Sequence, residues 1–206
     1  MPNLLKPLLL LAGVVILILI GFAVHWLVGA GLIAALLVYA FFANRSVFYV
    51  MKANAAYVQG DLDRALMLHE KAYSLRSRRP QHAIGYAYLL MKAGRPEQAE
   101  RVLQDTLRAK PPHDIQMQAK SNLATAYWLL DKREEAVRLL EDVHREYKTV
   151  TVVGNLGYLK LLAVDPEEAL AFNEEAYEYD DNDLTILDNL ADRKSTRLNS
   201  SHLGIS

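Results

Sequence analysis

The stretch NLATAYWLLDKREEAVRLLEDVHRE, residues 122–146, decides the fold. Its apolar and small residues recur at helical spacing as far as Trp128, stop at the polar run 131–133, and resume from Ala136 to Val143. This pattern predicts two short amphipathic helices around a tight polar turn. A helix pair this short cannot bury its apolar faces alone, so it needs similar pairs stacked on either side.

Similar pairs do flank this stretch. A small central residue recurs at intervals of 34, 37 and 33 positions, at Ala65, Ala99, Ala136 and Ala169. Short turns with Gly, Asp or Pro precede these alanines, as at Gly60, 93–96 and 165–166. The longer interval contains extra residues around 111–116, which we expect to form a longer loop.

This register resembles the tetratricopeptide repeat, a helix–turn–helix unit of roughly 34 residues. In that family small residues allow the two helices of a unit to cross closely. The resemblance covers about residues 47–183 and implies four copies, with 184–190 as the first helix of a fifth. For residues 45–191 it implies a tetratricopeptide-like α-solenoid.

The N-terminal region has a different composition. Residues 8–42 form an apolar run of 35 residues without Asp, Glu, Lys or Arg. A bilayer core needs only about 20 helical residues, so this run is too long for a single straight span. We predict a hairpin within residues 1–44, with spans 8–24 and 27–43. The expected fold class is therefore all-α, a transmembrane helical hairpin followed by the solenoid.

The charges that flank the two spans predict their orientation. Lys6 precedes the first span, Arg45 and Lys52 follow the second, and the turn near His25 has no Lys or Arg. The positive-inside rule then places both ends, and the repeats, on the cytoplasmic side of an integral membrane protein. If only one segment spans, the repeats face outward, as they would in an envelope-assembly or secretion machine.

Charge is unevenly distributed along the repeats. Residues 44–110 hold 12 Lys and Arg against 6 Asp and Glu, a net charge of +6, whereas residues 111–191 hold 7 against 17, a net charge of −10. The basic half would suit anionic lipid headgroups, although solvated helix faces can produce the same imbalance. The basic cluster 76–79 has no interleaved aromatic residues, so we expect no binding of nucleic acid.

No catalytic pattern is present. His69, His82, His113 and His144 are scattered without metal-ligand spacing, and the chain has no cysteine. Adjacent glutamates such as 134–135 point apart on a helix. We therefore expect no enzyme activity, no metal and no cofactor.

The family resemblance implies a concave groove lined by the first helix of each repeat, which holds a peptide or a helix of another protein. The positions that match are Asn54, Tyr57, Tyr88, Lys92, Thr125, Trp128 and Tyr158. Tyr and Trp are common binding anchors. The expected function is a membrane-anchored scaffold or adaptor that contacts lipid and a partner protein; a regulatory subunit of a membrane enzyme is the other alternative.

The last residues, 192–206, lose the helical period and become rich in Ser, Asn and Arg. This segment resembles the conceptual translation of a sequencing adapter. The resemblance implies a disordered, non-native tail, with the natural chain continuing past about Ala191 in a different sequence.

Overall fold

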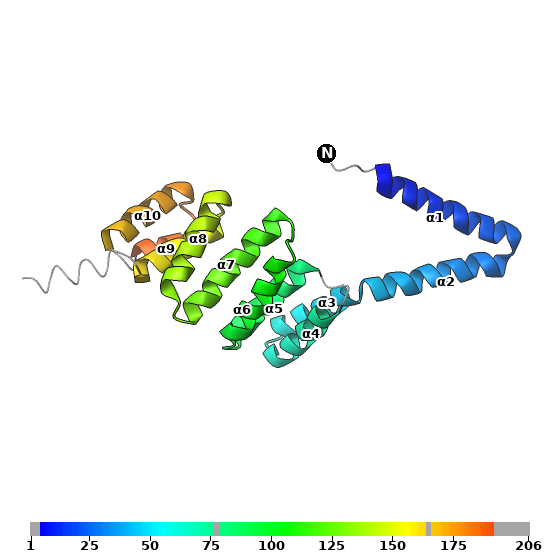
Figure 1. The fold of residues 1–206 in the computed structure, drawn as a ribbon, viewed down its shortest axis with the longest axis horizontal. Helices are drawn as coiled ribbons and strands as arrows, with labels where there is room; N and C mark the ends of the chain where they lie inside the picture. Colours follow the sequence, from blue (N-terminus) through cyan, green and yellow to red (C-terminus); the bar gives the residue numbers. More distant parts are fainter. Residues whose placement is uncertain (1–4, 76–78, 164–165, 192–206) are drawn as a thin grey trace, which may run out of the picture.

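The computed structural model describes residues 5–75, 79–163 and 166–191, and these are helical with no strand among them (Figure 1). The helices in chain order are α1 (Leu5–Val24), α2 (Trp26–Ala43), α3 (Arg45–Val58), α4 (Leu62–Ser74), α5 (Pro80–Lys92), α6 (Pro96–Arg108), α7 (His113–Leu129), α8 (Arg133–Glu146), α9 (Val150–Ala163) and α10 (Pro166–Tyr179). Residues 184–191 form a further helical segment. The predicted all-α fold is confirmed. The adapter-like tail lies outside the described residues.

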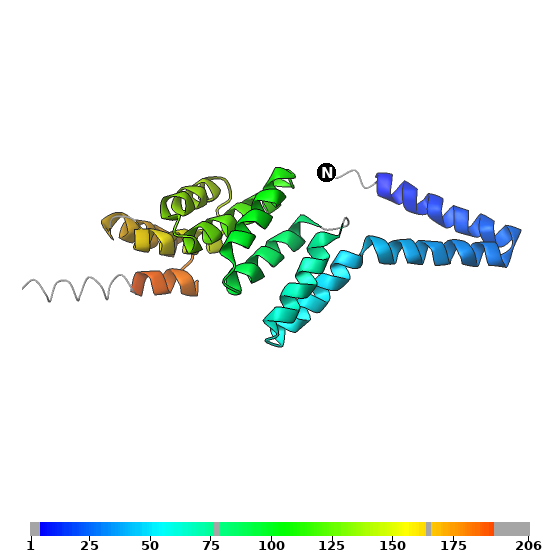
Figure 2. The same cartoon turned by 60° about the horizontal axis from the view of Figure 1, so that its bottom comes forward.

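The helices α1 and α2 form a hairpin that extends away from the rest of the chain. Its turn is a single residue, His25, whose extended backbone interrupts the helix and whose Nδ1 accepts a hydrogen bond from the backbone N–H of Leu27 at 3.2 Å. The two helices approach each other closely at Gly21 and Gly29 beside this turn. A side chain at either position would therefore meet the opposite helix. Away from the turn the two helices diverge in both views (Figures 1 and 2).

From α3 onward the chain is a row of antiparallel helix pairs, α3–α4, α5–α6, α7–α8 and α9–α10, each packed on the next (Figure 1). The four central alanines of the repeats are fully buried. Their methyl groups fill the helix crossings where larger side chains would force the backbones apart. Residues 184–191 pack on the last pair through the buried Ile186 and Asn189.

One detail of the sequence prediction is wrong. The extra residues near 111–116 do not form a longer loop, because α7 begins at His113 and only residues 109–112 connect it to α6. Ile115 and Met117 are buried, so the extra turn of helix covers apolar surface. Gln116 also donates from Nε2 to the carbonyl oxygen of Pro111 at 2.7 Å, which ties the first turn of α7 to the connection.

The turns inside the first three repeats share one backbone conformation. Gly60, Gly94 and Asp131 have positive φ angles of 83°, 70° and 59°. Glycine adopts this left-handed conformation without strain, whereas Asp pays a steric cost that its short polar side chain partly offsets. The departure from glycine at position 131 therefore leaves the path of the chain unchanged.

Candidate protein-binding face

The seven predicted groove residues all lie on the first helices of the repeats, α3, α5, α7 and α9. The structure brings them together in two groups. The first, which we call the aromatic cluster, consists of Asn54, Tyr57, Tyr88 and Lys92. The second lies in what we call the α7–α9 pocket and contains Thr125, Trp128 and Tyr158.

The aromatic cluster joins the first two repeats. The rings of Tyr57 and Tyr88 meet edge to face, with centroids 6.5 Å apart and planes at 81°. Lys92 Nζ lies 5.6 Å from the centroid of Tyr88, within the range of a cation–π contact. The neighbouring Tyr88 hydroxyl raises the pKa of Tyr57, so Tyr57 is a neutral phenol near pH 7. The cluster offers exposed ring faces, one cation and polar tips.

Asn54 connects this cluster to the interior. Its Oδ1 lies 3.4 Å from Nε2 of His69, a buried side chain on α4. His69 stacks on Tyr86 with ring centroids 6.4 Å apart. Burial lowers the pKa of His69, and the nearby His82 lowers it further, so the ring is neutral near pH 7. A neutral His69 that donates from Nε2 fixes the orientation of the Asn54 amide.

The α7–α9 pocket is a depression of about 340 Å³ between the third and fourth repeats. It is lined by Thr125, Trp128, Leu129, Leu140, Asn155, Tyr158 and Leu159. The guanidinium of Arg133 lies 5.4 Å from the Trp128 ring centroid and is paired with Asp131 at 2.7 Å, which restrains the indole. The pocket therefore combines an apolar floor with the polar tips of Asn155 and Tyr158.

Sequence reasoning missed four of the pocket residues, Leu129, Leu140, Asn155 and Leu159. Leu129 could have been found, because it stands as many positions before its central alanine as Lys92 does in the second repeat. Asn155 gives no comparable signal, since it reaches the pocket only through the stacking of α9 on α7 and α8.

The described residues contain no group of three or more His, Asp or Glu side chains that could hold a metal ion. The candidate face offers ring faces and one apolar depression, a composition that suits the side chains of another polypeptide.

Comparisons with known proteins agree with this architecture. Residues 56–120 and residues 117–151 each match a family described as tetratricopeptide repeat. These stretches are tetratricopeptide repeats, a fold of protein-interaction scaffolds rather than one of catalysts. No curated protein sequence matches the chain.

Several solved structures have the same fold. MamA residues 41 to the end from Desulfovibrio magneticus RS-1 is 15% identical with a TM-score of 0.60, covering 75% of this chain and 86% of that one. MamA AMB-1 is 20% identical with a TM-score of 0.54, covering 79% and 94%. A putative kinesin light chain from Podospora anserina is 18% identical with a TM-score of 0.62, covering 78% and 92%. At these identities the likeness establishes the solenoid fold alone.

Proposed function

We propose that this chain is a membrane-anchored tetratricopeptide scaffold or adaptor whose first-helix face binds another protein at the cytoplasmic surface of a membrane. The observation that carries the proposal is the pairing of a repeat array that exposes aromatic rings with two apolar helices that the rest of the chain leaves uncovered.

The binding part of the proposal rests on exposed aromatic side chains at repeated positions. Tyr88 and Tyr158 stand at the same distance before the central alanines of the second and fourth repeats, and each exposes more than two-fifths of its surface. An amphipathic helix or an extended peptide that runs across α5, α7 and α9 would contact both rings and the pocket between them. Rigid aromatic anchors next to a pocket are typical of binding hot spots.

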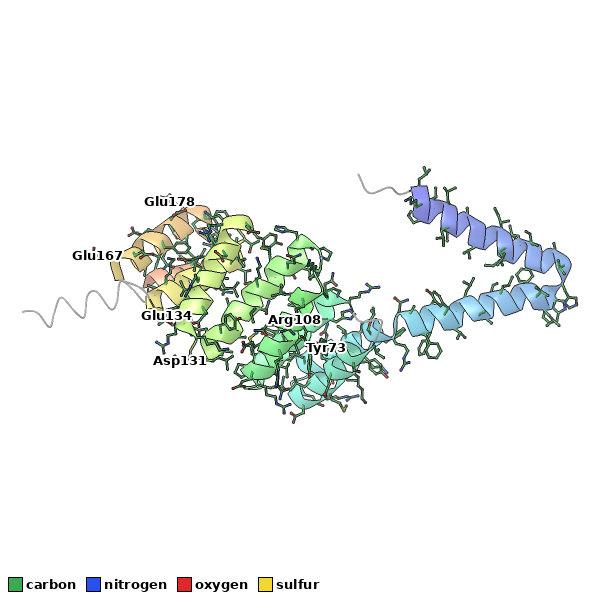
Figure 3. All side chains as sticks on the ribbon, viewed as in Figure 1. Tyr73, Arg108, Asp131, Glu134, Glu167 and Glu178 are labelled. Carbon is green, nitrogen blue, oxygen red and sulfur yellow. The ribbon has the colours of Figure 1, made fainter. Side chains whose placement is uncertain are left out.

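The anchoring part rests on α1 and α2. They have 20 and 18 residues with mean hydropathies of 2.9 and 2.2. Only 6% of the most apolar 18-residue stretch of each helix is buried. At about 1.5 Å per residue, each helix approaches the thickness of about 30 Å of a bilayer core. Most of their large apolar side chains are exposed and project away from the rest of the protein (Figure 3). Lipid is the medium that would cover them.

The orientation follows from the flanking charges. Lys6 and Arg45 lie at the two open ends of the hairpin, and His25 lies at its turn. Positive charges at the open ends favour the cytoplasm for those ends and for the repeats that follow.

Site-specific photo-crosslinking in intact cells tests the binding face. A benzoylphenylalanine at Tyr88 or Tyr158 should crosslink one common protein, and Trp128→Ala should weaken both crosslinks. Tyr177 on α10 is the matched control, because it is 42% exposed, close to the 47% of Tyr158, but lies on a second helix. Equal crosslinking from Tyr177, or none from either first-helix position, contradicts the proposed face.

Cysteine labelling tests the orientation, because the chain has no cysteine of its own. A membrane-impermeant maleimide should label Ser74→Cys in inverted vesicles but not in intact cells. His25→Cys should show the opposite pattern. Labelling of Ser74→Cys from outside intact cells would place the repeats outside and favour the envelope-assembly alternative.

A further inference from the structure

The junction between α2 and α3 continues the apolar surface of the hairpin into the first repeat. The ring of Phe41 on α2 lies 5.9 Å from that of Phe48 on α3 and 5.6 Å from that of Phe42. Phe48 is 51% exposed, and Met51, one helical turn further along α3, is 64% exposed. Apolar surface therefore extends beyond the end of α2 and is not covered by the repeats.

Basic side chains border this surface. Arg45 lies with its guanidinium carbon 5.4 Å from the Phe42 ring centroid, and Lys52 is exposed next to Met51. The chain contains no Asp or Glu before Asp61, so no acidic side chain in the preceding sequence offsets these charges.

The second repeat is tied to the same place. Arg79, at the start of α5, donates from Nη2 to Asn44 Oδ1 at 3.4 Å, and Asn44 Nδ2 donates to the carbonyl oxygen of Ala40 at 2.9 Å. Asn44 is the single residue between α2 and α3, so these two hydrogen bonds connect the end of α2 to the start of α5. Arg79 is exposed.

We propose that Arg45, Phe48, Met51, Lys52 and Arg79 form a docking surface for an anionic phospholipid bilayer, which seats the first repeat against the membrane. We call it the junction surface. The proposal rests on the membrane anchoring proposed above and adds to it a second, headgroup-level contact. Phe48 and Met51 enter the interface beside the end of α2, while the three cations contact lipid phosphates.

Two features favour a lipid surface over a protein as the occupant. The apolar part is continuous with a helix that is itself suited to lipid, so the bilayer that surrounds α2 already reaches Phe48. Long basic side chains beside aromatic rings are the usual composition of the bilayer interface, where each Lys or Arg favours anionic lipid. Docking would hold the array at one angle to the membrane and direct its acidic end, with Glu167 and Glu178, away from the anionic surface (Figure 3).

Spin labelling of the full chain in lipid vesicles tests the junction surface. A nitroxide at Met51→Cys should be accessible to oxygen and protected from a water-soluble nickel chelate in phosphatidylcholine vesicles that contain phosphatidylglycerol. Protection should decrease when phosphatidylglycerol is omitted. Leu162→Cys on α9, 49% exposed, is the matched control and should stay accessible to the chelate in both lipids.

Charge reversal provides the second measurement. With the label at Met51→Cys, Lys52→Glu should lower the ratio of protected to accessible label by roughly fivefold or more, because one basic side chain at an anionic surface contributes about that factor. Arg79→Glu should act in the same direction. Arg64→Glu, an exposed cation at the opposite end of the first repeat, should leave the ratio unchanged.

The outcomes separate this inference from the proposed function. A chain that stays in the vesicles after an alkaline carbonate wash, but whose label at Met51→Cys is as accessible to the chelate as that at Leu162→Cys, overturns the junction surface and leaves the anchor intact. Equal effects of Lys52→Glu and Arg64→Glu also overturn it. A chain that the wash removes from the vesicles overturns the anchor and, with it, the junction surface.

Discussion

The second and fourth repeats place different side chains at the same points of one helix pair. In the second repeat, Leu90 and Leu103 stand nine residues before and four residues after the central Ala99; in the fourth repeat, Lys160 and Asn173 stand at those distances from Ala169. All four side chains are buried. The same helix-pair backbone therefore accommodates either an aliphatic core or a polar core at these positions.

The polar core of the fourth repeat is held by specific contacts. Asn173 donates from Nδ2 to the carbonyl oxygens of Gly157 at 3.2 Å and Ala169 at 2.8 Å. Lys160 pairs with Glu141 at 2.7 Å and Glu168 at 3.0 Å. These carboxylates raise the pKa of Lys160 although burial alone would lower it. Each buried polar group depends on one arrangement of its neighbours, so the fourth repeat is the more sensitive to substitution nearby.

Exchanging the chemistry of the two repeats should have the largest effect. Leu103→Asn places an amide opposite Ala87, whereas Asn173 lies opposite Gly157. We therefore expect the new amide to lack the second carbonyl that Gly157 provides and to keep only that of Ala99, four residues earlier, as Asn173 keeps Ala169. Leu103→Ala should lower the free energy of unfolding by about 2–5 kcal/mol through lost burial and a cavity. Leu103→Asn should cost about 1–3 kcal/mol more, because the buried amide would be incompletely hydrogen-bonded.

Urea unfolding of the detergent-solubilised full chain, followed by far-ultraviolet circular dichroism, measures both variants. Amide hydrogen exchange in α6 shows whether the loss is local to the second repeat. Equal stability of the two variants would mean that the amide finds partners there, and that the polar core needs no matching glycine.

Gly157→Ala tests the same match from the other side and should have an intermediate effect. A methyl group at this position would overlap Asn173 Oδ1 and lie 3.1 Å from Asn189 Nδ2, although the equivalent residue of the second repeat is alanine. We expect a loss of about 1–3 kcal/mol from overpacking, measured by the same urea unfolding.

A double substitution controls for the cause. In an Asn173→Ala background, Gly157→Ala should cost less than it does alone, because the overlapping oxygen is gone. An undiminished cost would assign the effect to Asn189 or to the backbone rather than to Asn173.

The sequence alone predicts much of this architecture and little of its polar detail. The alanine spacing identifies the repeats, and the uncharged run with His25 near its middle predicts the hairpin, because both signals are local in the chain. The pairing of Asn173 with Gly157 is invisible locally, since the two side-by-side positions are 16 residues apart and each is unremarkable alone.

The candidate binding face shows the same limit. The family register places Tyr57 and Tyr88 on successive first helices but at different positions, eight residues before Ala65 and eleven before Ala99, so it does not indicate that their rings meet. It does not indicate the pocket, whose walls come from α7, α8 and α9 together. The assignment of the seven residues to partner binding stays a prediction.

His69 extends the comparison to the first repeat, where it stands four residues after Ala65, at the place of Leu103 and Asn173. Burial lowers its pKa in the folded chain below the unfolded value, so the unfolded state binds more protons as the pH falls. The stabilisation from neutral His69 is complete above about pH 6.5 and is lost as the pH falls toward the folded pKa.

His69→Phe should therefore reduce the acid sensitivity of the chain. The slope of unfolding free energy against pH below 6.5 should decrease by at most about 1.4 kcal/mol per pH unit, the limit for one titrating group. His82 and His144, whose pKa values burial also lowers, remain in the variant and set the residual slope. His113→Gln is the control, and an equal decrease in that variant would contradict the assignment to His69.

The smallest expected effect concerns the turn of the third repeat, which separates backbone strain from core chemistry. Asp131 has a φ of 59° where the first two repeats have Gly60 and Gly94. Asp131→Gly should stabilise the chain by about 0.5 kcal/mol, because the relief of left-handed strain exceeds the loss of the exposed ion pair with Arg133. Asp131→Ala should destabilise it, because alanine keeps the strain and loses the polar side chain. The melting temperatures should therefore be highest for Asp131→Gly, lower for the chain with Asp131, and lowest for Asp131→Ala. A higher melting temperature for Asp131→Ala than for the chain with Asp131 would show that the ion pair and the turn conformation matter less than helix propensity at this position.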